Sequence, residues 1–117
     1  MNKLIEEIVY SHLSSVMQVP VSFEVPVNVP DSFIVVEKTS SSTNEGFLET
    51  ATLAVQSYAG TMLAAAQLSS KVKEAMRDLV YSETVTKVSL NSDYNFTDTS
   101  TRRYRYQAVF DVTYYAR

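Results

Sequence analysis

Few residues in this sequence have the type and spacing that catalysis requires. His12 is the only histidine, and it lies in a stretch whose apolar residues recur at helical spacing, with no glycine-framed serine anywhere in the chain. A Ser–His–acid set would have to be built around this one side chain. We therefore interpret His12 as a histidine at the surface or at the boundary of the core, and we predict no catalytic residue.

A second candidate is the segment 93–97, whose oxygen-bearing side chains alternate as they do at the start of a calcium-binding loop. Such a loop needs a glycine where this chain has Asp98 and a bidentate glutamate where it has Tyr104. We interpret the segment as a polar turn. The chain has only two glycines and no cysteine, which excludes glycine-rich phosphate loops and thiolate metal sites. We predict no metal and no cofactor, and we expect a protein that is not an enzyme.

The bulk composition is that of one globular domain spanning residues 1–117. Of the 117 residues, 45% are apolar and 20% are charged, which is ordinary for a folded protein of this size. The sequence has no apolar run of the roughly 18 residues that a membrane helix needs. Its first residues also lack the basic-then-apolar order of a signal peptide. We expect no association with a membrane.

The net charge of −3 is unevenly distributed. Residues 1–60 contain two basic and seven acidic residues, whereas residues 102–117 contain four basic residues and one acidic residue. Tight binding of nucleic acid normally needs a basic excess, because neutralisation of phosphates supplies most of the affinity. The acidic total disfavours that function. The oppositely charged ends can attract each other within one fold or between neighbouring copies.

The hydrophobic pattern predicts two helices and four to five strands. Apolar residues at helical spacing predict helices over residues 2–17 and 62–81, the second capped by Thr61. Prolines after the first short strand confine the next segment to an edge or an extended arm. The order of elements predicts an α+β fold, in which two helices pack on one face of a mostly antiparallel or mixed sheet. The strands are predicted at residues 21–25, 33–36, 47–58, 84–91 and 103–115.

Two polar segments lack such periodicity. Residues 39–46 are small and polar, which predicts a mobile loop between two strands. Residues 91–101 are rich in Asn, Asp, Ser and Thr, which predicts a stretch of turns. In the strand before these turns, we expect Val88 and Leu90 to point inward.

Five of the eight tyrosines lie in the last quarter of the chain, close to three arginines. In residues 103–115 most of the aromatic and apolar side chains alternate with Arg103, Arg105 and other polar residues, which predicts a two-faced strand. These tyrosines can be core residues, or they can form a protein interface with the arginines. They can also stack on single-stranded nucleic acid, although the acidic total weighs against this.

Four phrases of the sequence, taken in order, carry a resemblance to a known family. They are PDSFIVVEK at 30–38, AVQSYAGT at 54–61, SDYNFTD at 92–98 and RYRYQA at 103–108. Their layout is similar to that of the small tail-terminator, or tail-completion, proteins of long-tailed bacteriophages and prophages, the family that includes the phage lambda tail terminator. The resemblance spans nearly the whole chain, with Thr97 where relatives usually have proline.

The resemblance implies a structural role in the virion. It implies a hexameric ring that caps the tail tube, ends its polymerisation and presents a surface for head–tail joining. The implied partners are further copies of the chain, the major tail tube protein and the head–tail connector proteins, while DNA passes through the channel without specific binding. The implied location is the head-proximal end of the tail, after assembly in the bacterial cytoplasm.

Within this hypothesis a ring closes through two different complementary surfaces on each subunit, and the acidic first half of the chain and its basic C-terminal strand offer such a pair. Two alternatives remain open. One is another neck or head–tail connector protein, and the other is a small α+β nucleic-acid-binding module. The predicted contact residues are Arg102, Arg103 and Arg105 as partner-facing charges, and Ser40, Ser41, Ser42, Thr43 and Asn44 as a docking loop.

Overall fold

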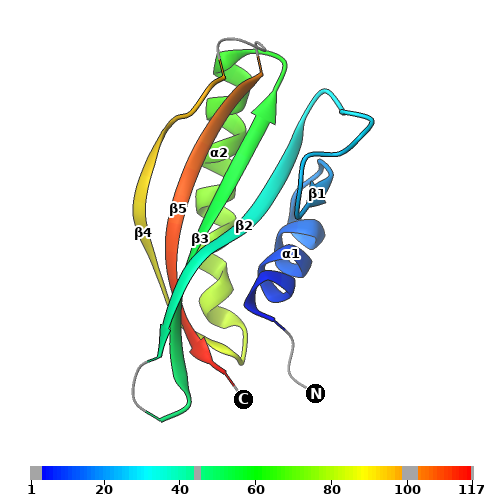
Figure 1. Cartoon of the computed structure of the whole chain (residues 1–117). Helices are drawn as coiled ribbons and strands as arrows, with labels where there is room; N and C mark the ends of the chain where they lie inside the picture. The colour runs from blue at the N-terminus through cyan, green and yellow to red at the C-terminus, as the bar shows by residue number, and fades with distance from the viewer. Residues whose placement is uncertain (1–3, 44–45, 99–102, 117) are drawn as a thin grey trace.

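The computed structural model describes residues 4–43, 46–98 and 103–116, and its elements follow the predicted order (Figure 1). Helix α1 is followed by three strands, helix α2 with a short 3-10 helix η1, and two further strands. The fold is α+β, as the sequence predicts. The elements are α1 (Ile5–Val16), β1 (Val21–Ser22), β2 (Phe33–Thr43), β3 (Leu48–Ala59), α2 (Met62–Arg77), η1 (Asp78–Tyr81), β4 (Val85–Asn95) and β5 (Tyr104–Tyr115).

The strands form one mixed sheet in the order β1-β2-β3-β5-β4. Only the short β1–β2 pair is parallel, and the other pairs are antiparallel. The central strands β3 and β5 pair over their full length, from Leu48 opposite Tyr115 to Ala59 opposite Tyr104. Figure 1 shows α2 lying across one face of this sheet, with α1 beside β2. We call the face covered by the helices the inner face and the opposite face the outer face.

The core lies between the inner face and the two helices. Every second residue of β3 and β5 points into it, as the alternating sequence pattern predicts. Full burial of one such apolar side chain contributes about 1.5–3 kcal/mol to stability, so this layer supplies most of the driving force for folding. The core residues from β3 and β5 are Ala51, Leu53, Val55, Ala108, Phe110, Val112 and Tyr114, and those from the helices include Ile5, Val9, Leu13, Leu68, Val72 and Met76.

Helix α2 begins where the sequence places its cap. The side chain of Thr61 accepts a hydrogen bond from the backbone N–H of Ala64 at 3.1 Å, which satisfies one of the free donors at the start of a helix. The predicted apolar stripe is buried at Leu68, Val72 and Met76 and is continued by Leu79 in η1. This stripe holds α2 against β3 and β5.

The prediction of a loop over residues 39–46 is wrong for residues 39–43. Strand β2 continues to Thr43, and its polar end pairs with the first half of β3, with Ser40 opposite Thr52 and Ser42 opposite Thr50. A shift in register between Lys38 and Ser40 marks a bulge. Serine and threonine side chains are compatible with an exposed strand. These residues show no apolar periodicity, so the sequence does not predict the strand, which forms because it pairs with β3.

Strand β4 also extends beyond its prediction, to Asn95, so the predicted turns at residues 91–95 are strand. Leu90 lies opposite the buried Phe110 and therefore on the inner face, as predicted, but its side chain is 49% exposed. This exposure follows from the position of β4 at the edge of the sheet, where it has a neighbouring strand on one side only. Val88 is partly buried against the core, as predicted.

Candidate interaction surface

The outer face carries a ladder of polar side chains between β3 and β5. Four directly opposed pairs are joined by side-chain hydrogen bonds, and such cross-strand pairs stabilise a sheet and hold its register. The sequence predicts a polar face for residues 103–115 but does not indicate which residues of β3 lie opposite it. The pairs are Thr50–Thr113 at 3.0 Å, Thr52–Asp111 at 2.8 Å, Gln56–Gln107 at 2.8 Å and Tyr58–Arg105 at 2.8 Å.

One end of this ladder is a continuous chain of hydrogen bonds across three strands. Arg105 donates to the Tyr58 hydroxyl, which donates to Oε1 of Gln56 at 3.2 Å. Gln56 then donates through Nε2 to Gln107, which donates to the Tyr94 hydroxyl. Gln56 and Gln107 are both buried, where an amide without a partner is costly. The network therefore fixes the arrangement of the outer face.

Arg105 is held by its own chain. Its Nε donates to the carbonyl oxygen of Phe96 at 2.6 Å, and its guanidinium carbon lies 4.2 Å from the centroid of the Phe96 ring. Tyr58, its other partner, stacks on Phe33 with ring centroids 4.4 Å apart. Arg105, predicted to face a partner, is thus partly buried among aromatic residues of its own subunit. Contact with a partner remains a prediction for this residue.

The other predicted contact residues lie in two places, one beside Arg105 and one far from it. Arg103 is exposed immediately before β5, while Arg102 lies outside the described residues. Ser40, Ser41 and Ser42 are exposed on the last part of β2, whereas the side chain of Thr43 and the whole of Asn44 lie outside the described residues. Residues 40–42 pair with the beginning of β3, and Tyr104 pairs with its end. The two predicted patches are therefore at opposite ends of the sheet (Figure 1).

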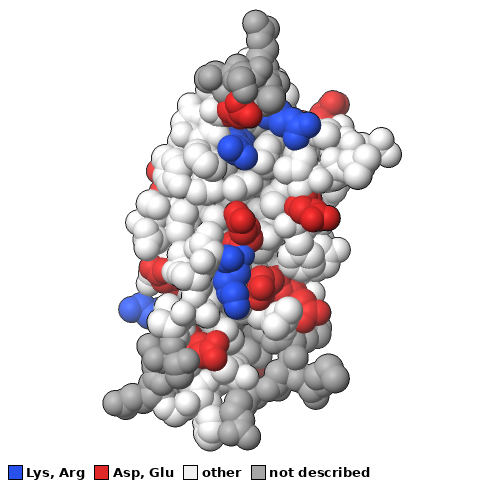
Figure 2. Space-filling model, viewed as in Figure 1, with Lys and Arg blue, Asp and Glu red and all other residues white. Residues whose placement is uncertain are grey.

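A groove lies where the start of α1 meets the edge of β2. Its volume is about 430 Å³, and one carboxylate oxygen of Glu6 is buried without a hydrogen-bond partner among the described residues. Figure 2 shows acidic side chains gathered over α1 and the adjoining part of β2. We call this feature the α1–β2 groove. It is lined by Leu4, Glu6, Glu7, Phe23, Val36, Glu37 and Lys38.

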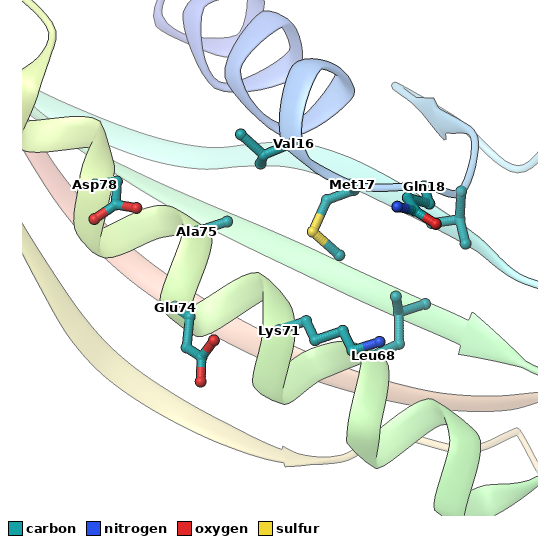
Figure 3. A pocket seen from close by; sticks show the side chains of 9 residues that line it. Val16, Met17, Gln18, Leu68, Lys71, Glu74, Ala75 and Asp78 are labelled. Carbon is teal, nitrogen blue, oxygen red and sulfur yellow. The ribbon is translucent and has the colours of Figure 1, made fainter.

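A second groove, of about 490 Å³, lies between the end of α1 and α2 (Figure 3). The Met17 side chain reaches toward α2, whereas the Glu74 carboxylate points away from α1 (Figure 3). Lys71 is the basic residue in its lining. The charged groups do not converge on one point, so this groove does not have the arrangement of a small-molecule site.

Tyr114 is the residue whose ionisation the fold changes most clearly. Burial raises the pKa of its hydroxyl to about 12, and the hydrogen bond that it donates to Glu49 at 2.7 Å adds to the shift. The negative charges of Glu49 and Glu6 act in the same direction. This hydroxyl is a structural donor that stays protonated at physiological pH.

The segment between β1 and β2 exposes apolar side chains at every second position. The sequence predicts a sheet edge or an extended arm here, and it does not mark the segment as a contact surface, because valines normally indicate core. The signal that identifies it is the alternation of Val25, Val27 and Val29 with prolines. We call residues 25–30 the valine arm.

Within the described ranges, no group of three or more His, Cys, Asp or Glu side chains could hold a metal ion. None of the helices in these ranges has the length and apolar character needed to cross a membrane. No family model matches the chain, and no curated protein matches it either.

Proposed function

We propose that this protein is a structural component of long-tailed bacteriophage particles, a tail terminator that assembles as a ring on the end of the tail tube. In this role it ends tube polymerisation and offers a surface for head–tail joining. The observation that carries the proposal is the separation of the exposed Arg103 from the exposed Ser40–Ser42 segment by the length of β3. A ring requires two distinct surfaces on each subunit.

The charge distribution supports the same proposal. Acidic side chains gather near the α1–β2 groove (Figure 2), and Arg103 is exposed at the start of the last strand. Opposite charges on separate surfaces favour head-to-tail docking of copies and disfavour wrong orientations. The net charge of −3 also suits a channel through which DNA moves without being held.

Under this proposal the partners are further copies in a hexamer, the major tail tube protein and the head–tail connector proteins. The protein is assembled in the bacterial cytoplasm and resides at the head-proximal end of the tail in the virion. It works by docking and performs no turnover chemistry. It has no cofactor.

A nucleic-acid-binding module is the main alternative of another class. Tyr94 and Phe96 are both about 40% exposed beside Arg105, which gives a small surface for base stacking. Tyr58 is only 4% exposed, and the Arg105 guanidinium is occupied by Tyr58 and Phe96. We therefore favour docking of proteins. Binding of labelled single-stranded DNA at physiological salt, with a steep salt dependence, would support the alternative.

Electron microscopy of particles made without this gene tests the proposal. A terminator is needed to stop tube growth, so the expected products are overlong tails that lack heads. Detached tails of normal length would instead indicate another head–tail joining protein. Intact infectious particles would contradict a structural role of either kind. Restoring the gene on a plasmid is the control, and it should restore normal tails.

A further inference from the structure

The edge of β2 is open beyond the short β1 strand. β1 pairs only with Ile34 and Val35, and no described segment pairs with the remainder of this edge, from Val36 to Thr43. The N–H of Ile34 donates to the carbonyl oxygen of Pro20, on the β1 side. Because backbone groups alternate in direction along a strand, those of Val36 and Lys38 also point to this open edge. An open edge of this kind is a template for another strand.

The open edge borders the α1–β2 groove, which has an apolar floor. Val36 belongs to both the strand edge and the groove, and Leu4 and Phe23 supply further apolar surface. Three acidic residues, at positions 6, 7 and 37, and one basic residue, Lys38, surround this floor, which leaves its surroundings net negative. An added strand therefore has to be apolar on one side and free of negative charge.

The valine arm has these properties. Val25, Val27 and Val29 are 38%, 98% and 45% exposed, and they point to one side if the arm is extended. No residue between positions 25 and 30 is charged. An almost fully exposed valine between two half-exposed ones contributes nothing to the core of its own subunit, but it can fill an apolar groove elsewhere.

The prolines of the arm leave one of its edges able to pair. Pro26 and Pro30 lie an even number of residues apart, so both occupy the same edge of an extended arm, together with Asn28. Prolines lack the N–H that a sheet ladder needs and block that edge. The opposite edge keeps the N–H and C=O groups of the three valines. The arm can thus pair with one strand through its valine edge. Its proline edge then prevents a further strand from joining the sheet.

None of the residues of the arm lines the groove of its own subunit in this structure. β1 runs parallel to β2, so the connection between them must turn back toward the beginning of β2. Figure 1 shows this connection looping outward near the start of β2, while β2 itself, with its open edge, runs away from that end. Figure 2 shows an uncharged protrusion at the place of this connection in Figure 1.

We propose that the valine arm of one copy adds as a strand to the open edge of β2 in a neighbouring copy, with its valines in the α1–β2 groove. The donor and acceptor surfaces are different, so each copy gives one arm and receives one. Such head-to-tail contacts close into a ring when the rotation between copies allows it. This inference rests on the proposed function, since both require association of copies, and it assigns the residues that make the contact.

The prolines provide a matched pair of variants. Val27→Pro removes an N–H from the pairing edge, whereas Asn28→Pro removes one from the edge that Pro26 and Pro30 already block. We expect Val27→Pro to weaken self-association of the full chain at least three- to tenfold, because it removes one hydrogen bond of the pairing edge and also takes the central valine out of the groove. Asn28→Pro should change it less than twofold. Sedimentation velocity over a concentration series measures both, and equal effects of the two variants would overturn the proposal.

Disulfide trapping tests the contact independently, because the natural chain has no cysteine. Two tagged forms, Val27→Cys and Leu4→Cys, are mixed and oxidised. A disulfide needs Cα atoms within about 7 Å, so we expect a mixed dimer from this pair. Val27→Cys mixed with Leu63→Cys, an exposed position on α2, is the control and should give none.

The outcomes separate this inference from the proposed function. Rings seen by electron microscopy without the Val27–Leu4 cross-link would overturn arm exchange and leave the terminator role standing. A specific cross-link together with intact infectious particles after gene deletion would support arm exchange and contradict the terminator role. A chain that stays monomeric and forms no cross-link above the Leu63→Cys control would overturn arm exchange.

Discussion

The Nε2 atom of His12 lies 2.6 Å from the carbonyl oxygen of Ala75, which joins helix α1 to helix α2. A carbonyl oxygen only accepts hydrogen bonds, so Nε2 carries the hydrogen in this contact. The bond is partly buried, and it links residues that are 63 positions apart in the sequence. The single histidine of the chain thus helps to fix α1 on the inner face, beside the groove of Figure 3.

Replacing His12 by alanine should loosen this docking. We expect His12→Ala to lower the free energy of unfolding by about 1–3 kcal/mol, because it removes a hydrogen bond and leaves a partly buried carbonyl with fewer partners. Urea denaturation measures the change. Ser11→Ala, at an exposed neighbouring position on α1, is the control and should stay within about 0.5 kcal/mol of the natural chain. Equal stability of the two variants would contradict a structural role for His12.

The buried pair Gln56–Gln107 should behave as a unit. Gln56→Leu or Gln107→Leu alone leaves a buried amide without its partner, which costs about 1–3 kcal/mol. The double variant Gln56→Leu/Gln107→Leu removes both amides, so it should cost less than the sum of the two single changes. A double-mutant cycle in urea measures the difference. Additive costs would show that the two side chains act independently.

The raised pKa of Tyr114 leads us to expect a loss of stability at alkaline pH. Its pKa is raised to about 12 in the fold, against about 10 in an unfolded chain. Because the fold favours the protonated hydroxyl, this shift contributes about 2–3 kcal/mol to the free energy of unfolding below pH 10. That contribution is lost as the pH rises toward 12. Unfolding measured between pH 9 and pH 12 should show this decline, and Tyr114→Phe should reduce it. Tyr115→Phe, at an exposed neighbour, should leave the decline in place.

Charge reversal should distinguish the roles of Arg103 and Arg105, the two arginines of the predicted interface that the structure describes. Arg105→Glu breaks the contacts with Tyr58 and Phe96, so we expect a loss of stability of about 2–4 kcal/mol. Arg103→Glu changes an exposed side chain and should leave the fold intact while impairing assembly. Thermal melting reports the first effect, and complementation of a strain lacking the gene reports the second. Normal tails from Arg103→Glu would remove Arg103 from the predicted interface.

Much of the fold follows from the spacing of apolar residues. The stripe through Leu68, Val72 and Met76 predicts α2, and the alternation along residues 103–115 predicts the two faces of β5. The end of β2 escapes such reasoning, because Ser40–Ser42 carry no apolar signal and are ordered by pairing with β3. The exposure of Leu90 likewise depends on β4 being an edge strand, which is a property of the sheet rather than of the segment.

The candidate surfaces were less accessible to sequence reasoning. The alternating pattern places Arg105 and Gln107 on one face of β5. Their partners, Tyr58 and Gln56, are set by the register between β3 and β5, and the paired residues lie about 50 positions apart in the sequence. The exposure of Val27 follows from the parallel pairing of β1 with β2, because the chain between these strands must reverse its direction to reach the start of β2. Neither relationship is contained in a local window of sequence.

We propose that this protein acts by taking a fixed place in a phage tail. Immunogold labelling of purified particles, with antibody raised against the full chain, tests it most directly. We expect label at one site per particle, where the tail meets the head, and none on particles from a strain without the gene. Particles that carry no label, or label spread along the whole tail, would contradict the claim.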